Sequence, residues 1–81
     1  MIAAALFSAA ADALAKEDDD AAEVLLTQAA DAVTDDYPQA AAGARLVRDQ
    51  IQSCDLIRRR RAAAIVDFRE WAAALTEPEA S

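Results

Sequence analysis

Turn-forming residues are almost missing from this chain, which holds one glycine and two prolines in 81 residues. An all-β domain of many short strands needs such residues at regular intervals. The residues that are abundant instead, such as Ala, Leu, Arg and Glu, favour the helix. We therefore predict an all-α fold, and 81 residues allow one domain at most.

The hydrophobic content of 56% overstates the core, because 24 residues are Ala and only 17 are Leu, Ile, Val or Phe. At about 25 cal/mol per Å² of buried apolar area, such small side chains give a chain of this size little stability. A domain this small usually needs a disulfide, a metal or a partner chain. Cys54 is the only cysteine and there is no histidine. We therefore expect no internal disulfide, no metal or other cofactor, and stabilisation by association.

The net charge of −7 is unevenly distributed. Residues 1–40 hold nine acidic side chains and one basic one, whereas residues 41–81 hold six acidic and seven basic ones. The acidic half repels nucleic acids and anionic membranes. The apolar stretch before Asp12 lacks a basic leader and is shorter than the roughly 20 residues that cross a bilayer, so we expect a cytoplasmic protein without membrane contact. The many Arg and Ala residues fit a GC-rich bacterial or phage gene.

Apolar spacing predicts a helical hairpin in the first 35 residues. The first helix, over 2–16, carries one apolar stripe whose members lie four apart: Ile2, Leu6, Ala10 and Leu14. The acidic run 17–20 ends this helix and caps a second one over 20–35, with Asp19 or Asp20 accepting from its free N–H groups, because carboxylates suit the positive end of a helix.

Residues 6–29 fit one tetratricopeptide unit without gaps. Leu6 takes the large position of its first helix, and the small, large, small pattern of its second is matched by Ala22, Leu26 and Ala29. The stretch therefore resembles that repeat, which implies two antiparallel helices joined by a turn. Glu17 stands where the repeat usually has glycine, and Ala13 where it has an aromatic residue. No second unit follows, and solenoids need about three, so only the hairpin is taken from the resemblance.

Two arrangements remain open for the second half of the chain. Pro38 starts a helix, with Asp35 and Asp36 as expected caps, and no strong stop signal follows until Thr76. A continuous helix over 38–75 would be about 57 Å long, against about 22 Å for each helix of the hairpin. Alternatively, the chain breaks at 52–55 and Ser53 caps a fourth helix. The tail 77–81 is expected to fray.

We favour the continuous helix, because one series of residues follows it from end to end with alternating spacings of four and three, as in a packing seam. The series comprises Ala40, Ala44, Val47, Ile51, Cys54, Arg58, Arg61, Ile65, Phe68, Ala72 and Leu75. Cys54 is expected to be a small buried hydrophobe within this seam.

The hairpin is too short to cover such a rod, so its apolar stripe would stay exposed without a partner. We expect a second copy, in a dimer or larger assembly, or another protein to complete a small helical bundle. The expected partner-binding residues are Arg58, Arg61, Ile65, Phe68, Trp71 and Leu75. The apolar members would be buried against the partner, while the two arginines set the register by pairing with carboxylates.

These features favour a non-catalytic protein–protein interaction module, such as a self-associating adaptor, regulator or assembly factor. We expect no enzyme, because the sequence has no phosphate loop and no serine nucleophile elbow, and so short a chain scarcely encloses a pocket. The alternative is a nucleic-acid-binding regulator that adds four arginines to Arg58 and Arg61, namely Arg45, Arg48, Arg59 and Arg60. A variant of it is an acidic mimic of nucleic acid, in which the carboxylates of residues 1–40 occupy a basic groove.

Overall fold

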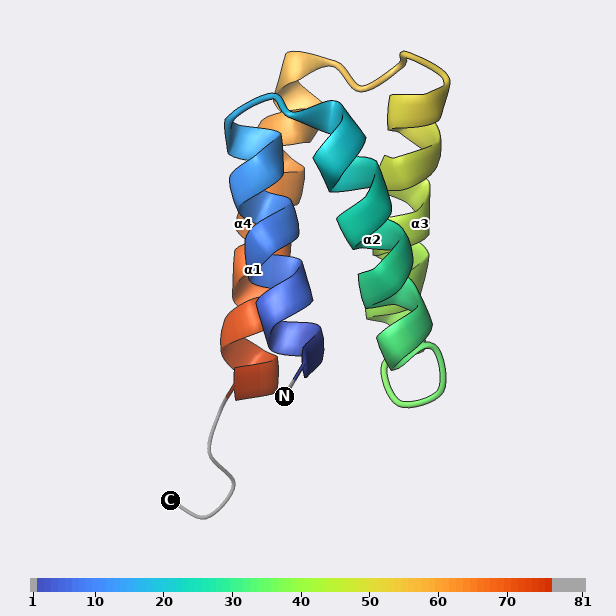
Figure 1. Ribbon diagram of the computed structural model, residues 1–81, viewed down its shortest axis with the longest axis vertical. Coiled ribbons are helices and arrows are strands. Elements are labelled where there is room, and N and C mark those ends of the chain that lie inside the picture. Colours follow the sequence, from blue (N-terminus) through green and yellow to red (C-terminus); the bar gives the residue numbers. More distant parts are fainter. Residues whose placement is uncertain (1, 77–81) are drawn as a thin grey trace.

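The computed structural model describes residues 2–76, which form four α-helices and no strand. The helices are α1 (Ile2–Ala15), α2 (Asp19–Val33), α3 (Pro38–Gln52) and α4 (Arg58–Thr76). They alternate in direction, so that α1 and α3 run upward and α2 and α4 run downward in Figure 1. The predicted all-α fold is confirmed, while the tail 77–81 that was expected to fray lies outside the described residues.

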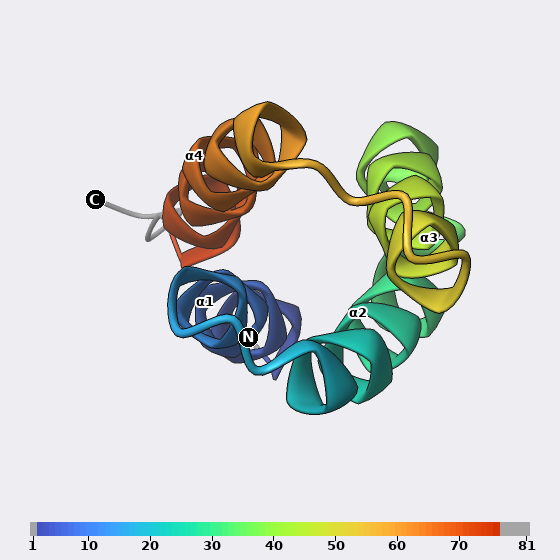
Figure 2. The same cartoon turned by 90° about the horizontal axis from the view of Figure 1, so that it is seen from above.

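The helices form an open arc instead of a closed bundle. α1 packs against both α2 and α4, and α2 packs against α3, but α3 and α4 have hardly any contact. Seen from above, the order is α4, α1, α2, α3, and the connection 53–57 bridges the gap between the two ends of this row (Figure 2). The fold is therefore an up-and-down array of four helices that stays open between α3 and α4.

The core contains few large side chains and many alanines. The largest side chains without exposed surface are Phe7, Leu14, Leu26 and Val33, all on α1 and α2. Buried alanines fill the space between them, which lets the helices approach closely. From α4, Phe68 places its ring centroid 5.6 Å from that of Phe7. The core therefore follows α1, on which the rest of the hairpin and α4 converge.

α1 and α2 pack against each other in the part of the chain where a hairpin was predicted, and α1 ends in a turn that would suit glycine. Glu17 has a left-handed φ of 59°. The N–H groups of Glu17 and Asp18 donate to the carbonyls of Leu14 and Ala13, at 3.1 and 2.9 Å, which is the Schellman pattern. The left-handed region costs an L residue about 1 kcal/mol. Asp18, and not Asp19 or Asp20 as predicted, then caps α2 by accepting a hydrogen bond from the N–H of Ala21 at 3.4 Å; Asp19 and Asp20 already lie in the first turn of the helix.

The continuous helix that we favoured over 38–75 is wrong, because the chain leaves the helix through a second Schellman motif. Cys54 has a φ of 58°. The N–H groups of Cys54 and Asp55 donate to the carbonyls of Ile51 and Gln50, at 3.1 and 2.7 Å. The break at 52–55 is therefore the observed arrangement, although Ser53 is the C-cap of α3 and not the N-cap of a fourth helix.

This break contradicts the prediction that a long helix carries an exposed apolar stripe. It returns α4 to the side of α1, where Phe68 and Leu75 are only 2% and 8% exposed. The same chain thus shelters both side chains, and no second copy is needed to cover them. Cys54, which we expected to be buried in the seam, is exposed in the turn.

The start of α3 agrees with one prediction from the sequence and contradicts another. Pro38 begins the helix as predicted, because its fixed φ suits the first turn. The N-cap is Tyr37, and no side chain caps α3 there, so the capping expected of Asp35 and Asp36 does not occur.

Candidate interaction site

A pit opens between α3 and α4, at the place where the array is not closed. Its volume is about 360 Å³, within the range of ligand pockets. The lining residues are Gln39, Gly43, Leu46, Val47 and Gln50 from α3, and Arg60, Ala63, Ala64, Asp67, Phe68 and Trp71 from α4. We call this hollow the α3–α4 pit. It exists because its two walls belong to helices that do not pack against each other.

Small residues widen the α3–α4 pit, and apolar residues form its floor. On α3, a Cβ atom added at Gly43 would meet no other atom within 4 Å. On the opposite wall, Ala63 is exposed and Ala64 is buried. Val47 and Phe68 are also buried and complete an apolar floor. Leu46 stands on the rim, with 52% of its surface exposed. The pit therefore offers an apolar surface to a side chain that enters from outside.

Two features join the α3 and α4 sides of the array, one toward each end of these helices. The connection 53–57 crosses from α3 to α4 at one end (Figure 2). Toward the other end, the ring of Tyr37 lies edge-on to that of Trp71, with 6.0 Å between the centroids. Such an aromatic pair is itself stabilising. With a volume of about 360 Å³, the pit is sized for one or two large side chains and is too small for a whole helix.

Polar groups mark the end of the pit that lies toward the connection. The side-chain oxygen of Gln50 is buried and receives no hydrogen bond from residues 2–76. An unpaired buried acceptor of this kind costs about 1–3 kcal/mol. Arg60 is exposed and forms no ion pair within the described part of the chain. This end of the pit thus presents an acceptor that lacks a donor and a cation that lacks an anion.

The residues predicted to bind a partner are dispersed by the break in the helix. Phe68 and Trp71 line the pit, whereas Ile65 and Leu75 pack against the core elsewhere. Arg58 is exposed at the start of α4. These residues therefore do not form one exposed stripe, and Phe68 and Leu75 are buried within the chain itself.

Arg61, which was predicted to pair with a carboxylate of a partner, pairs with one of its own chain. Its two terminal nitrogens bind the two oxygens of Asp19 at 2.7 and 3.1 Å, and one of them also donates to the carbonyl of Leu14 at 3.2 Å. This hydrogen bonding lowers the pKa of Asp19, aided by the positive charge of Arg61 and opposed by burial. The same pairing raises the pKa of Arg61. The pair joins the first turn of α4 to the α1–α2 hairpin.

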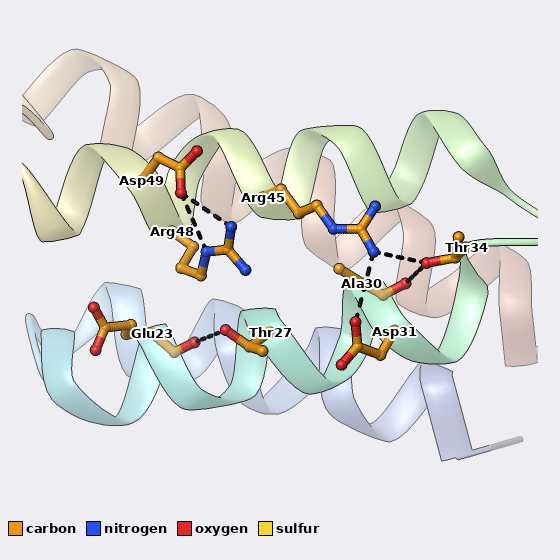
Figure 3. A network of polar contacts seen from close by, with 8 residues as sticks. All are labelled: Glu23, Thr27, Ala30, Asp31, Thr34, Arg45, Arg48 and Asp49. Atoms are coloured by element: carbon orange, nitrogen blue, oxygen red, sulfur yellow. Dashed lines mark hydrogen bonds and ion pairs between the residues drawn. The ribbon is translucent and has the colours of Figure 1, made fainter.

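The arginines proposed for polyanion binding do not share one surface. Arg45 donates to Thr34 at 2.8 Å and lies 3.5 Å from the carboxylate of Asp31, between α3 and α2 (Figure 3). Arg48 binds its neighbour Asp49 at 3.0 Å. Both charges are thus compensated. Arg59 and Arg60 are exposed on α4, across the gap from α3.

The α3 wall of the pit was missed by the sequence analysis. Gly43, Leu46 and Gln50 lie at helical spacings of three and four, so they share one face of α3. The exposed leucine on that face was the available signal. The sequence alone could not identify this leucine as part of a site, because the gap between α3 and α4 depends on where the chain turns.

Residues 2–76 contain no group of three or more His, Cys, Asp or Glu side chains placed to hold a metal ion. No helix in the same range has both the length and the apolar character needed to span a bilayer. Comparison of the chain with known protein families, with curated proteins and with solved structures finds no match.

Proposed function

We propose that this chain is a non-catalytic protein-interaction module whose α3–α4 pit receives an aromatic side chain from a helix of another protein. The observation that carries the proposal is the open edge of the array, where an apolar pit contains an acceptor without a donor. Anchor residues that fill such pits dominate the binding energy of protein interfaces. The chain would thus act as an adaptor, a regulator or an assembly factor.

The chemistry of the pit selects the kind of anchor. Its floor of Val47, Ala64 and Phe68 calls for an apolar body. The unpaired oxygen of Gln50 calls for an N–H or O–H group on that body. Trp and Tyr combine both properties and are enriched at interface hot spots for this reason. A phenylalanine would fill the same space and leave the Gln50 oxygen unsatisfied, so it should bind less tightly.

The helices and charges around the pit indicate what the rest of the partner should be like. Two helices flank the pit, so a third helix can lie across them while its anchor points inward. Arg60 on the rim, with Arg58 and Arg59 beside it, favours a carboxylate on that helix near the connection 53–57. We therefore expect an amphipathic partner helix that carries Trp or Tyr at its centre and Asp or Glu toward one end.

A selection experiment tests this proposal. A library of displayed helical peptides with random positions is selected against the wild-type chain, and the affinities of enriched peptides are measured by fluorescence anisotropy. We expect enrichment of Trp or Tyr together with acidic residues. Binding should weaken at least tenfold to the variant Ala63→Trp, in which the new indole fills the pit, which corresponds to about 1.4 kcal/mol.

Ala62→Trp provides the matched control, because Ala62 is exposed on the same helix and does not line the pit. Peptide binding to this variant should equal binding to the wild type. Equal loss in the two variants, or a selection that enriches no aromatic peptide, would contradict the proposal.

Nucleic-acid binding through the arginines has less support. Arg45 and Arg48 are compensated by aspartates on α2 and α3, which leaves a small basic group at the start of α4. An acidic mimic has the same weakness, because Asp12 and Asp19 are paired with arginines of α4. We expect no binding of duplex or single-stranded DNA at low salt. Binding that falls steeply with added salt would favour this alternative.

A further inference from the structure

The connection between α3 and α4 combines features that permit helix exchange. It comprises residues 53–57 and contains neither glycine nor proline. Cys54 takes the left-handed conformation that L residues disfavour, and Ile57 is 60% exposed. In a straight helix Cys54 would lose this unfavourable conformation. Short connections under strain are the places where helices exchange between copies.

The contacts that seat α4 do not depend on α3 of the same copy. α4 packs on α1 and hardly touches α3. Three side-chain pairs hold it, with distances of 5.6, 2.7 and 3.3 Å: Phe68 with Phe7, Arg61 with Asp19, and Arg69 with Asp12. A second copy presents an identical surface for α4, which we call its seat and which consists of α1 and the start of α2. An exchanged α4 would therefore keep every one of these contacts, and the edge-on pair of Trp71 with Tyr37 would form with the Tyr37 of the other copy.

The sequence across the connection is compatible with a straight helix. The alternating spacing of four and three that runs along α3 continues through Cys54 into α4. Straightening would join the two helices over 38–76, a rod of about 58 Å. Leu56 is the side chain of the connection that packs on the core, and straightening removes that contact. This loss favours the closed monomer when the protein is dilute.

We infer that two copies of this chain exchange α4: the connection straightens, and α4 of each copy packs on α1 of the other. The inference does not use the α3–α4 pit. Ala63→Trp should therefore leave the exchange unchanged, which keeps it separable from the proposed peptide binding.

Complementary charge variants test the exchange directly. Asp19→Arg places two arginines together, and Arg61→Asp places two aspartates together, so each variant alone loses the ion pair. In an exchanged dimer of one Asp19→Arg copy and one Arg61→Asp copy, each seat combines one arginine with one aspartate. We expect a mixture unfolded and refolded together at about 100 μM to give the heterodimer mass by native mass spectrometry. Its share should exceed either homodimer at least tenfold, because both pairs are restored only there.

Two variants of the connection provide a second test that leaves the ion pair intact. Cys54→Gly removes the penalty of the left-handed turn, whereas Cys54→Ala keeps it and favours the straight helix. The thiol is exposed, so neither substitution disturbs the core. We expect the dimer of Cys54→Ala to dissociate at about a hundredfold lower concentration than that of Cys54→Gly, because two connections contribute. Light scattering over a concentration series measures this difference.

The inference is overturned if the mixed charge variants refold only as monomers or if the two Cys54 variants dimerise equally. If a charge variant fails to fold, the comparison of Cys54→Ala with Cys54→Gly tests the exchange by itself.

Discussion

The guanidinium group of Arg61 binds both carboxylate oxygens of Asp19, at 2.7 and 3.1 Å, across 42 positions of the chain. The same side chain donates to the carbonyl of Leu14 at 3.2 Å. One arginine thereby joins α4, the end of α1 and the start of α2. Arg61 lies among four consecutive arginines, but its place on the helix turns it inward and leaves the other three exposed.

Arg61→Gln should lower the free energy of unfolding by about 1–2 kcal/mol, because it removes both the ion pair with Asp19 and the hydrogen bond to the carbonyl of Leu14 at a partly exposed site. Urea unfolding followed by circular dichroism measures the change. Arg60→Gln is the matched control, since Arg60 is exposed and forms no ion pair within residues 2–76. A similar loss in both variants would show that the pair contributes nothing specific.

The pH dependence of stability should reveal the same pair. Arg61 lowers the pKa of Asp19 in the folded state, so the folded protein binds fewer protons there than the unfolded chain. The contribution is therefore complete above the unfolded pKa of about 3.9 and is lost as the pH falls through the lowered folded value. The stability difference between the wild type and Asp19→Asn should be constant at pH 5–7, by about 1 kcal/mol or less, and vanish in stronger acid. A difference that persists at about pH 2 contradicts this assignment.

Phe68→Ala should destabilise the chain by about 3–5 kcal/mol, because it leaves a cavity beside Phe7 in the core. Thermal or urea unfolding measures this loss at several protein concentrations. Val66→Ala, at an exposed position of the same helix, should change stability by about 0.5 kcal/mol or less. A loss no larger than that of Val66→Ala would contradict the packing of Phe68 against Phe7 in the core.

Glu17→Gly should be more stable than Glu17→Ala by about 1 kcal/mol, because glycine alone adopts φ 59° without a Cβ penalty. Both variants remove the same carboxylate, so their difference isolates the backbone conformation. Urea unfolding of the pair provides the measurement. Equal stabilities would mean that the left-handed turn carries no penalty in this chain.

The fold class and the hairpin follow from the sequence, because both depend on local signals. The hairpin was placed at 2–16 and 20–35 and is found at 2–15 and 19–33. Pro38 marked the start of α3 correctly, since a proline constrains its own backbone. These signals act within a turn or two of the residues that carry them.

The break after α3 had only a weak local signal, Ser53, which kept the break open as the alternative to a continuous helix. Glycine usually marks the left-handed residue of a Schellman motif, and here Glu17 and Cys54 occupy that position. The acidic run revealed the first turn, whereas Ser53 and Asp55 in the second did not outweigh the apolar spacing that continues through Cys54. The docking of α4 on α1 decides the outcome there, through Phe68 and Arg61, and such long-range packing leaves no local pattern.

Only part of the site could be predicted from the sequence, for the same reason. Phe68 and Trp71 were singled out as contact residues, and both line the α3–α4 pit. Their neighbours across the pit, Gly43 and Gln50, could not be connected with them while the two helices were taken as one. A pit between two helices exists only after the turn is known.

The order α4, α1, α2, α3 gives the helices unequal protection from solvent. α1 has a packed neighbour on both sides, whereas α3 packs only against α2. Local openings that detach α3 should therefore need less free energy than openings that expose α1. Amide hydrogens of α3 should accordingly exchange with deuterium before those of α1, so the α3 wall of the pit should open more readily than the helix that carries Phe7.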